Sequence, residues 1–510
     1  MERYSIMNYR HYITVLLAFV LCVGCKEKDK EKEKENEINL ATGAVYRLTT
    51  TEGEGFAKFE RMPDGKWSGV YYLNEGRMMA DARKVGLTSE NGKLTLTEIT
   101  GDTIPILSHS RYEAPEFKDY PKTWTYQDSA YAVSVKKDVV YAKAEGYWIS
   151  YPDTGGTINE IFKVKKKELK RGKTELKLTM DVYLPKDTKS GSHRPLLVLV
   201  HGGAFFNGDK RDPGFPEFAR YFAGRGYVVA SVNYRLGFRK SIPSVNRAGF
   251  RAIQDVDAAI RYLVHKKDYG VDPNRVFVAG TSAGGITALN VAFMKEENIP
   301  NDADEEGGIK AVSPELKDTY TVLGVGNLWG AVNDLSILNN ATTSVISFQS
   351  TGDRVVPFGE GHPFKNVFLN WLVFPKMYGS EKITEFLGPQ RASLKSYDLP
   401  GRHTIHTDED EKGNTILSPR FYEMESGMCQ FFSNLMSPPP VVPEHTGLTQ
   451  TFQVTSSDIE SVYWQVQGGV ILEQNGCSAK VLLFSDAPSY TVTVCGTYKS
   501  GETFRHTWAL

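Results

Sequence analysis

The sequence predicts an α/β fold in which a mostly parallel sheet carries helices on both faces, with a β-rich segment on either side of it. From about residue 155 onward, short apolar runs alternate with segments of helical period, as in chains whose strands and helices alternate. Two runs, Pro195–Val200 and Val276–Ala279, are apolar throughout, which is typical of strands buried on both faces. Residues 42–150 and 445–510 instead show short alternating strands separated by turns.

The first 41 residues predict export and a tether. Two arginines precede the apolar run Ile13–Gly24, which is too short to cross a bilayer as a helix. Cys25 follows directly, so residues 1–24 resemble a bacterial lipoprotein signal peptide. This resemblance implies a lipid on Cys25 that anchors the protein to the cell envelope, at the outer membrane or the cell surface. An ordinary secretory signal with an incidental cysteine is the alternative. Residues 25–41, rich in Lys and Glu, predict a solvated tether.

Charge and cysteine usage narrow the classes of partner. The chain has 60 basic and 61 acidic side chains and a formal net charge of -1, with no basic stripe, which argues against nucleic-acid binding. No cysteine or histidine spacing indicates a metal site, and no cofactor is expected. Cys477 and Cys495 lie in neighbouring predicted strands. In an exported protein they could form a disulfide or remain two free thiols, and the sequence does not decide between the two.

The two β-rich segments are predicted to form separate domains. In residues 42–150, Asp64-Gly65 and Asn91-Gly92 are strong hairpin signals, and no helical period competes with the strands. Residues 445–510, which follow a proline-rich linker, have a central Trp464 and a late strand that contains Tyr490. These features resemble a small immunoglobulin-like or PKD-like domain.

Residues 155–437 are predicted to form the α/β domain between them. The helical period is clearest in Ala248–Lys266, another helix begins near Ala283, and Met424–Leu435 closes the domain. The predicted strands are Leu176–Tyr183, which leads in antiparallel, then Pro195–Val200, Tyr227–Asn233, Val276–Ala279, Tyr320–Val325, Val345–Gln349 and Leu394–Leu399.

A serine motif lies between a buried strand and a helix of this domain. The motif is Gly280-Thr281-Ser282-Ala283-Gly284, directly after the strand Val276–Ala279. Glycines at both ends allow a sharp turn and a close approach of strand and helix, so the serine projects above the sheet. Ser282 is therefore the candidate nucleophile.

A second motif follows the strand Pro195–Val200. The sequence His201-Gly202-Gly203-Ala204-Phe205 resembles the H-G-G-G and H-G-G-A motifs of esterases and lipases. This resemblance implies an oxyanion hole built from the backbone amides of Gly203, Ala204 and Ala283. An alanine replaces the third glycine of the usual motif.

The acid and the base are expected after the nucleophile. Asp353 follows the strand Val345–Gln349 in a segment that resembles the Asp-x-x-Val-Pro segment of α/β-hydrolases, with Asp334 as its competitor. Fold order places the base after the acid and behind the strand Leu394–Leu399. His403 and His406 both meet this condition, and His403 is favoured because it lies nearer the end of the strand. Arg402 stands where the family usually has glycine.

Together these elements make residues 165–435 look like the α/β-hydrolase superfamily, closest to its carboxylesterase and acetyl- or feruloyl-esterase-like branch. Val232–Gly237, Asp255–Ile260 and Gly270–Arg275 are also similar to segments of that branch. The resemblance implies a serine carboxylic-ester hydrolase that acts through an acyl-enzyme on small acyl or aryl esters, with esterified glycans as one candidate substrate. A serine peptidase of the same fold and a surface-binding protein with a non-catalytic hydrolase scaffold are the alternatives. The sequence assigns no oligomeric state.

Overall fold

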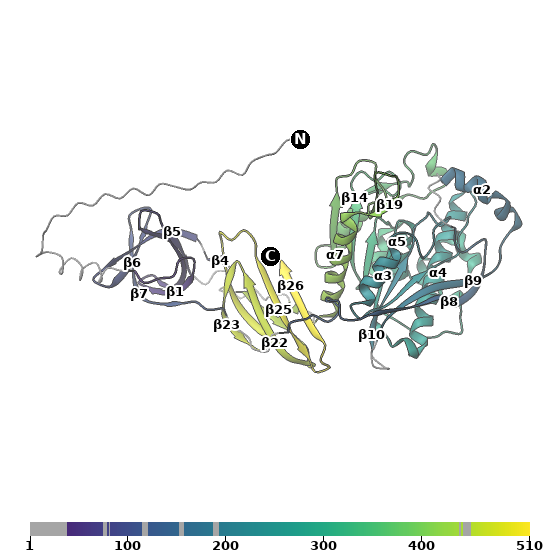
Figure 1. Cartoon of the computed structure of the whole chain (residues 1–510). Coiled ribbons are helices and arrows are strands. Elements are labelled where there is room, and N and C mark those ends of the chain that lie inside the picture. Colours follow the sequence, from purple (N-terminus) through teal and green to yellow (C-terminus); the bar gives the residue numbers. More distant parts are fainter. Residues whose placement is uncertain are drawn as a thin grey trace, which may run out of the picture.

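The computed structural model describes residues 38–74, 79–80, 82–114, 121–151, 158–186, 193–437, 440–441 and 450–509. The predicted signal peptide, Cys25 and most of the tether lie outside the described residues. Three parts follow one another in space: a small barrel, a pair of sheets from the C-terminal residues, and a large sheet covered by helices (Figure 1). The C-terminal residues therefore lie between the other two parts.

The large sheet has eight strands in the order β17-β14-β13-β12-β10-β11-β9-β8. Its strands are β8 (Val133–Gly146), β9 (Thr174–Pro185), β10 (Arg194–Val200), β11 (Val228–Val232), β12 (Val271–Thr281), β13 (Val322–Leu328), β14 (Ser344–Ser350) and β17 (Ala392–Tyr397). All neighbours from β11 to β17 pair in parallel, whereas β9 pairs antiparallel with β8 and β11. All seven predicted strands of this domain are confirmed, including the antiparallel lead-in.

Helices cover both faces of this sheet. They are α2 (Ile158–Arg171), α3 (Phe215–Ala223), α4 (Ile242–His265), α5 (Ala283–Phe293), α6 (Ser380–Leu387) and α7 (Pro419–Met436). Leu196, Val198 and Val200 of β10 pack on the side of α4 and α5, whereas Leu197 and Leu199 pack on the side of α3 and α7. Because successive strand residues point to opposite faces, this two-sided cover explains the uninterrupted apolar run. No helix among the described residues is both long and apolar enough to cross a membrane.

The strand order positions the site. β10 lies between β11 and β12, so the chain reverses its direction of travel across the sheet at β10. In open parallel sheets, crevices form at such a point, outside the carboxyl ends of the strands. The serine motif begins at the carboxyl end of β12, and the His201–Phe205 segment begins at the carboxyl end of β10. This is the architecture of an α/β-hydrolase.

The N-terminal strands close into a barrel. Its members are β1 (Val45–Thr50), β2 (Gly53–Arg61), β3 (Trp67–Leu73), β5 (Ala82–Glu90), β6 (Lys93–Glu98) and β7 (Thr103–Arg111). The hairpin at Asn91-Gly92 is confirmed, since both residues adopt the positive φ that a tight two-residue turn requires. The expectation of one β-domain over residues 42–150 is wrong at its end, because β8 leaves the barrel and joins the large sheet through its long ladder with β9.

The C-terminal residues form two sheets around one apolar core. The strands are β20 (Pro440–Val441), β21 (Gln450–Val454), β23 (Gly469–Asn475) and β24 (Ser478–Phe484) in one sheet, and β22 (Ile459–Gln467), β25 (Thr491–Tyr498) and β26 (Thr503–Ala509) in the other. Trp464 is buried in the shared core and stacks on Trp508. The likeness of this part to an immunoglobulin or PKD domain stays a prediction.

Cys477 and Cys495 are both free thiols in the structure, so they do not form the disulfide that the sequence left as an alternative. Cys477 is exposed in the turn between β23 and β24, whereas Cys495 is buried in β25 of the other sheet. The hairpin turn that carries Cys477 belongs to one sheet and β25, which carries Cys495, belongs to the other.

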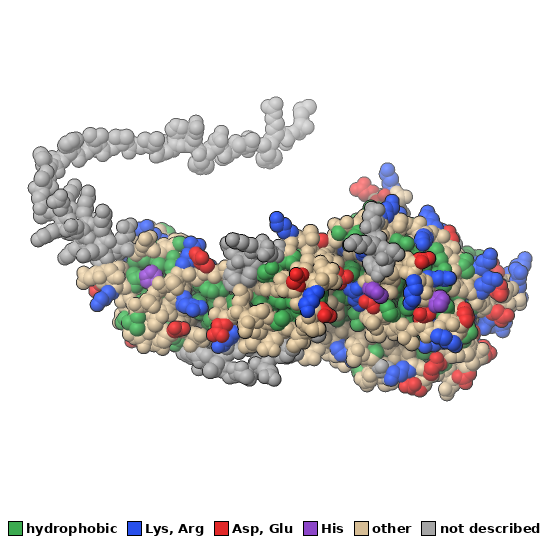
Figure 2. Space-filling model, turned by 90° about the horizontal axis from the view of Figure 1, so that it is seen from below, with side chains coloured by type: hydrophobic (Ala, Val, Ile, Leu, Met, Phe, Trp, Pro, Cys, Tyr) green, Lys and Arg blue, Asp and Glu red, His purple; other side chains and the backbone are tan. Residues whose placement is uncertain are grey.

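Both junctions of the C-terminal sheets are made by specific contacts. The short strand β4 (Met79–Ala80) pairs with β24, and Tyr72 of the barrel stacks on Phe484 with ring centroids 4.0 Å apart. On the other side, Glu502 accepts hydrogen bonds from Tyr126 and Arg275. Acidic and basic side chains are interspersed over the face of the large α/β domain seen in Figure 2.

Candidate active site

Ser282 occupies the tight turn between β12 and α5. Its backbone has φ 52° and ψ -117°, a left-handed conformation that costs energy in a residue with a side chain. Its N–H donates to the carbonyl of Leu328 over 2.8 Å, which fixes the turn against β13. A Cβ on Gly284 would lie 2.0 Å from the Val200 carbonyl oxygen, so only glycine lets α5 approach β10 this closely. The serine motif thus holds Ser282 at the edge of the sheet by local sterics.

A hydrogen-bonded chain of three side chains runs from Ser282 to Asp353. His403, in the loop after β17, has its Nε2 2.8 Å from the Ser282 Oγ and its Nδ1 2.8 Å from the Asp353 Oδ2. The Asp353 carboxylate is buried, and its Oδ1 accepts from the backbone N–H groups of Val355 and Val356. An acceptor at Nδ1 leaves Nε2 free to accept the hydroxyl proton of Ser282.

Asp334, the competitor of Asp353, lies elsewhere. It caps the short helix Leu335–Asn340 by accepting from the N–H and Oγ of Ser336, each over 2.8 Å. The structure therefore brings Asp353, and not Asp334, to the imidazole of His403.

His406, the alternative base, makes other contacts. Its Nε2 donates to the carbonyl of Pro213 over 3.1 Å, and its ring stacks on Trp329 with centroids 5.2 Å apart. Nδ1 is buried with no partner among the described residues. Burial lowers the pKa of the His406 imidazole to about 4, so the ring is neutral near pH 7. The interactions of His406 are therefore structural.

The buried His406 predicts a stability loss in mild acid. An unfolded histidine titrates near pKa 6.5, so between pH 6.5 and 4 the unfolded state binds a proton that the folded state does not. The contribution of His406 to the free energy of unfolding is therefore fully present above pH 6.5 and is lost as the pH falls toward 4. We expect urea unfolding to show that the step from pH 7.5 to 5 costs about 1 to 2 kcal/mol less in His406→Gln than in wild type. Equal losses in both proteins would contradict this assignment.

The segment after β10 presents backbone amides toward Ser282. Gly203, Ala204 and Phe205 all have positive φ, so the alanine that departs from the usual motif adopts the left-handed conformation as well. A Cβ on Gly202 would lie 3.4 Å from the Cβ of Ser282, which shows how closely this loop approaches the serine turn. Within the described part of the chain, no carbonyl or side chain accepts from the amides of Gly203, Ala204 or Ala283. Unpaired amides beside a nucleophile can stabilise an oxyanion.

His201 holds this loop rather than taking part in proton transfer. Its Nδ1 donates to the Gly202 carbonyl over 2.8 Å, and its ring stacks on Tyr234 with centroids 4.4 Å apart. The Tyr234 hydroxyl donates to the carbonyls of His201 and Gly202. Burial lowers the pKa of His201 to about 4, so the ring stays neutral.

Two cavities meet at Ser282 and differ in polarity. One is an apolar pocket that enters between α4 and α5 and includes Ala204, Phe205, Ile286, Phe364, Phe374 and Met377 in its walls. The other is a wider groove whose walls carry many polar side chains, among them Asn207, Asp209, Arg211, Asp212, Thr404 and Thr407. His403 borders the groove and not the pocket. A substrate bound across Ser282 would therefore place an apolar end in one cavity and a polar end in the other.

Sequence reasoning missed Gln349, which supports the acid. Its Nε2 donates to the Asp353 Oδ2 over 3.3 Å and to the carbonyl of Val356 over 3.1 Å. Gln349 could have been predicted to matter because it places a polar amide side chain in a buried strand, where such a group needs hydrogen-bond partners. In the described residues, no group of three or more His, Cys, Asp or Glu side chains is arranged to hold a metal ion.

Known proteins share the part of the chain that carries this geometry. Residues 180–365 match the BD-FAE family model. Arylacetamide deacetylase-like 2 from Homo sapiens is 29% identical over 248 residues, which are 45% of this chain and 57% of the relative. Carboxylesterase 3B from Mus musculus is 34% identical over 112 residues, which are 21% of this chain and 19% of the relative. The solved apo form of Thermogutta terrifontis esterase 2 is 18% identical with a TM-score of 0.34, covering 51% of this chain and 91% of that structure.

These matches cover only part of each protein. The chain spans 57% of the length of the human relative and 19% of the mouse relative. The family match includes the His201–Phe205 segment, Ser282 and Asp353, and ends before His403. The part of the chain that carries these residues is similar in sequence to the BD-FAE family and to esterases.

Proposed function

We propose that the protein is a serine carboxylic-ester hydrolase in which Ser282 is the nucleophile, His403 the general base and Asp353 the acid that orients it. The single observation that carries this proposal is the continuous hydrogen-bonded chain Ser282–His403–Asp353. It combines a nucleophile, a base with a free acceptor nitrogen and a buried carboxylate within hydrogen-bond reach, which is the requirement for nucleophilic acyl transfer. The similarity to esterases agrees with it.

The proposed reaction proceeds through an acyl-enzyme. His403 accepts the proton of Ser282 as the Oγ attacks the ester carbonyl, and the amides of Gly203, Ala204 and Ala283 donate to the oxyanion. Asp353 stabilises the imidazolium, which then gives its proton to the leaving alcohol. Water, deprotonated by His403, attacks the acyl-enzyme in the second half and releases the carboxylic acid.

The two cavities support a division of the substrate between them. The apolar pocket would bind the acyl group, and the polar groove, which His403 borders, would bind the alcohol that receives a proton from that imidazole. Hydroxyl-rich alcohols suit a groove lined by amide, carboxylate, guanidinium and hydroxyl groups. Esterified glycans are therefore the alcohol class that we propose alongside simple acyl and aryl esters.

An ester and amide comparison tests the reaction type. The purified protein should hydrolyse p-nitrophenyl acetate with a kcat/KM at least 1000-fold above that for an aminoacyl p-nitroanilide. A protein that cleaves the anilide at a comparable rate would be a peptidase of the same fold. Absence of turnover with either substrate would favour a surface-binding protein with a hydrolase scaffold.

The position of the protein in the cell is proposed from the sequence alone. A lipid on Cys25 would anchor the protein to the cell envelope, and the charged residues behind it would hold the folded part away from the membrane. A mass measurement of the N-terminal peptide from membrane fractions tests this proposal, because lipid on Cys25 supports it and an unmodified, released N-terminus contradicts it.

A further inference from the structure

The apolar pocket is a channel that extends along α5. On this helix its walls are formed by residues that share one face, Ala283, Ile286, Thr287 and Asn290, and Met294 directly after the helix continues the wall. From Ala283 to Met294 the helix advances by about 16 Å at about 1.5 Å per residue. The channel therefore leads from the nucleophile deep between the helices.

The two polar side chains on this face are turned toward their own helix. Thr287 Oγ1 donates to the Ala283 carbonyl and Asn290 Nδ2 donates to the Ile286 carbonyl, each over 2.9 Å. Asn290 Oδ1 is buried and has no hydrogen-bond partner in the described part of the chain. An apolar chain along this face would leave these helical hydrogen bonds intact.

The facing wall comes from α4, where Gly249 leaves open space. The α4 members are Val245, Asn246, Gly249, Phe250 and Ile253. A Cβ on Gly249 would meet only the Phe205 ring, at 3.7 Å, an ordinary contact distance. Glycine lowers the stability of a helix interior relative to alanine, so its presence here is not explained by the helix itself. Its lack of a side chain widens the channel.

The end of the channel farthest from Ser282 is lined by an apolar cluster. Met294 and Pro300 line the channel, and Met294 packs with Phe250, Ile253 and Ala303 in that cluster. A chain that reached this end would therefore still contact apolar side chains.

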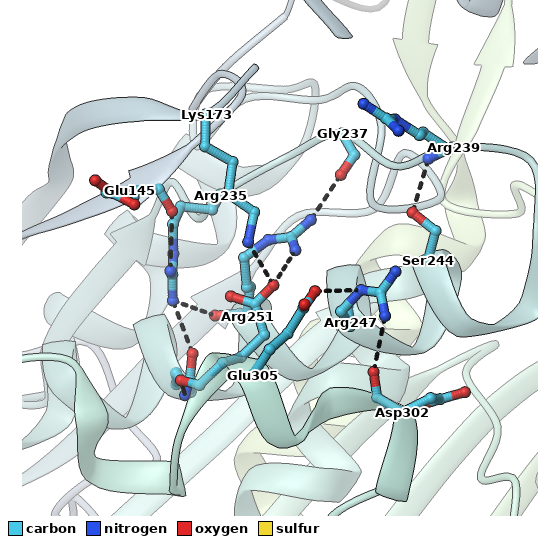
Figure 3. Close-up of polar contacts among 12 residues, drawn as sticks. Glu145, Lys173, Arg235, Gly237, Arg239, Ser244, Arg247, Arg251, Asp302 and Glu305 are labelled. Carbon is cyan, nitrogen blue, oxygen red and sulfur yellow. Dashed lines mark hydrogen bonds and ion pairs between the residues drawn. The ribbon is translucent and has the colours of Figure 1, made fainter.

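A buried network of charges holds this end in place. Arg251 of α4 pairs with Glu306 over 2.7 Å and donates to the Gly237 carbonyl over 2.7 Å (Figure 3). Gln254 donates to the carbonyls of Glu306 and Gly308. Nearer the surface, Arg247 pairs with Glu305 over 3.0 Å (Figure 3). Breaking a buried ion pair such as Arg251–Glu306 is costly, so the segment around Glu306 is tied firmly to α4. The α4 wall of the channel is thus held in place.

We propose that this channel binds a linear acyl chain of medium length, about six to ten carbons, in preference to acetyl. This inference rests on the proposed function, because it assigns the acyl side of the same site. An extended carbon chain advances by about 1.3 Å per carbon, so a chain of that size occupies most of the helical length between Ser282 and Met294. Each further methylene buried in the channel should raise kcat/KM by about twofold to fourfold.

A series of p-nitrophenyl esters tests the inference. At concentrations below micelle formation, kcat/KM should rise from acetate to octanoate by at least 50-fold in total and should rise no further by hexadecanoate, whose extended chain is longer than the apolar wall along α5. A profile that is flat or declines from acetate onward contradicts the inference while leaving the proposed function intact. Failure to hydrolyse any ester of the series contradicts both.

Gly249→Leu provides the matched structural test. A leucine side chain there would enter the channel, so the ratio of kcat/KM for octanoate to that for acetate should fall at least tenfold. Ser426→Leu, which adds the same side chain to the exposed surface of α7, should keep the wild-type ratio. An unchanged ratio in a folded Gly249→Leu protein contradicts the inference, and the wild-type profile remains decisive if that variant does not fold.

Discussion

Replacing Ser282 by alanine is expected to lower kcat for ester hydrolysis by about a million-fold. The Ser282 hydroxyl is the group that forms the covalent bond with the acyl group. It is also the group whose proton His403 accepts, and alanine offers no such proton. Removal of one member of such a triad costs nearly as much as removal of all three, because the groups act as a unit. The measurement is kcat for p-nitrophenyl acetate with protein purified free of wild type.

The same substitution should leave the fold unchanged. Among the residues that the structure describes, the Ser282 side chain hydrogen-bonds to His403 alone, and alanine has the same backbone preferences at positive φ. The thermal midpoint should therefore stay within about 3 °C of wild type. Ser426→Ala on the exposed surface of α7 is the control and should keep full activity. A Ser282→Ala protein that retains a tenth of wild-type activity would disprove the proposed nucleophile.

Substituting Asp353 by asparagine is expected to lower kcat by about 10⁴-fold with little change in KM. The amide oxygen would remain with the N–H groups of Val355 and Val356, so the amide NH₂ would face the imidazole. His403 Nδ1 would then have to accept, which places the proton on Nε2 and prevents it from accepting the Ser282 proton. KM should change little because Asp353 borders neither cavity.

Asp334→Asn supplies the matched control for this prediction. Asp334 caps a short helix, and an asparagine can still accept from the Ser336 N–H while its NH₂ donates to the Ser336 hydroxyl, so kcat should stay within twofold of wild type. Both variants should be compared by steady-state kinetics with the same ester. If Asp334→Asn were the slow variant and Asp353→Asn the active one, the acid assigned here would be wrong.

Most of the candidate site could be predicted from local sequence, because short-range steric contacts set the geometry of the site. The position of Ser282 follows from the glycines around it, and the His201–Phe205 loop follows from consecutive residues behind one strand. The pairing of Asp353 with His403 depends on two loops 50 residues apart, and fold order alone predicted that they meet at one edge of the sheet. The sequence therefore named the residues that the structure brings together but left His403 and His406 as alternatives.

The residues that decide between these alternatives come from distant parts of the chain. The ring of His406 stacks on Trp329 and donates a hydrogen bond to the carbonyl of Pro213. The sequence around His406 indicates neither contact. Arg402, the departure from the family pattern, contacts Asp408 and so fastens the loop that carries His403. The closure of the barrel depends in the same way on the nonlocal pairing of β1 with β7.

Covalent labelling tests the central claim most directly. A fluorophosphonate should react with the intact protein by loss of fluoride and leave one phosphonyl group, which peptide mass spectrometry should place on Ser282. The adduct should be absent from Ser282→Ala and should form far more slowly in His403→Ala, because the base activates the hydroxyl. An adduct on another serine, or a wild-type protein that stays unlabelled, would contradict the assignment of Ser282 as the nucleophile.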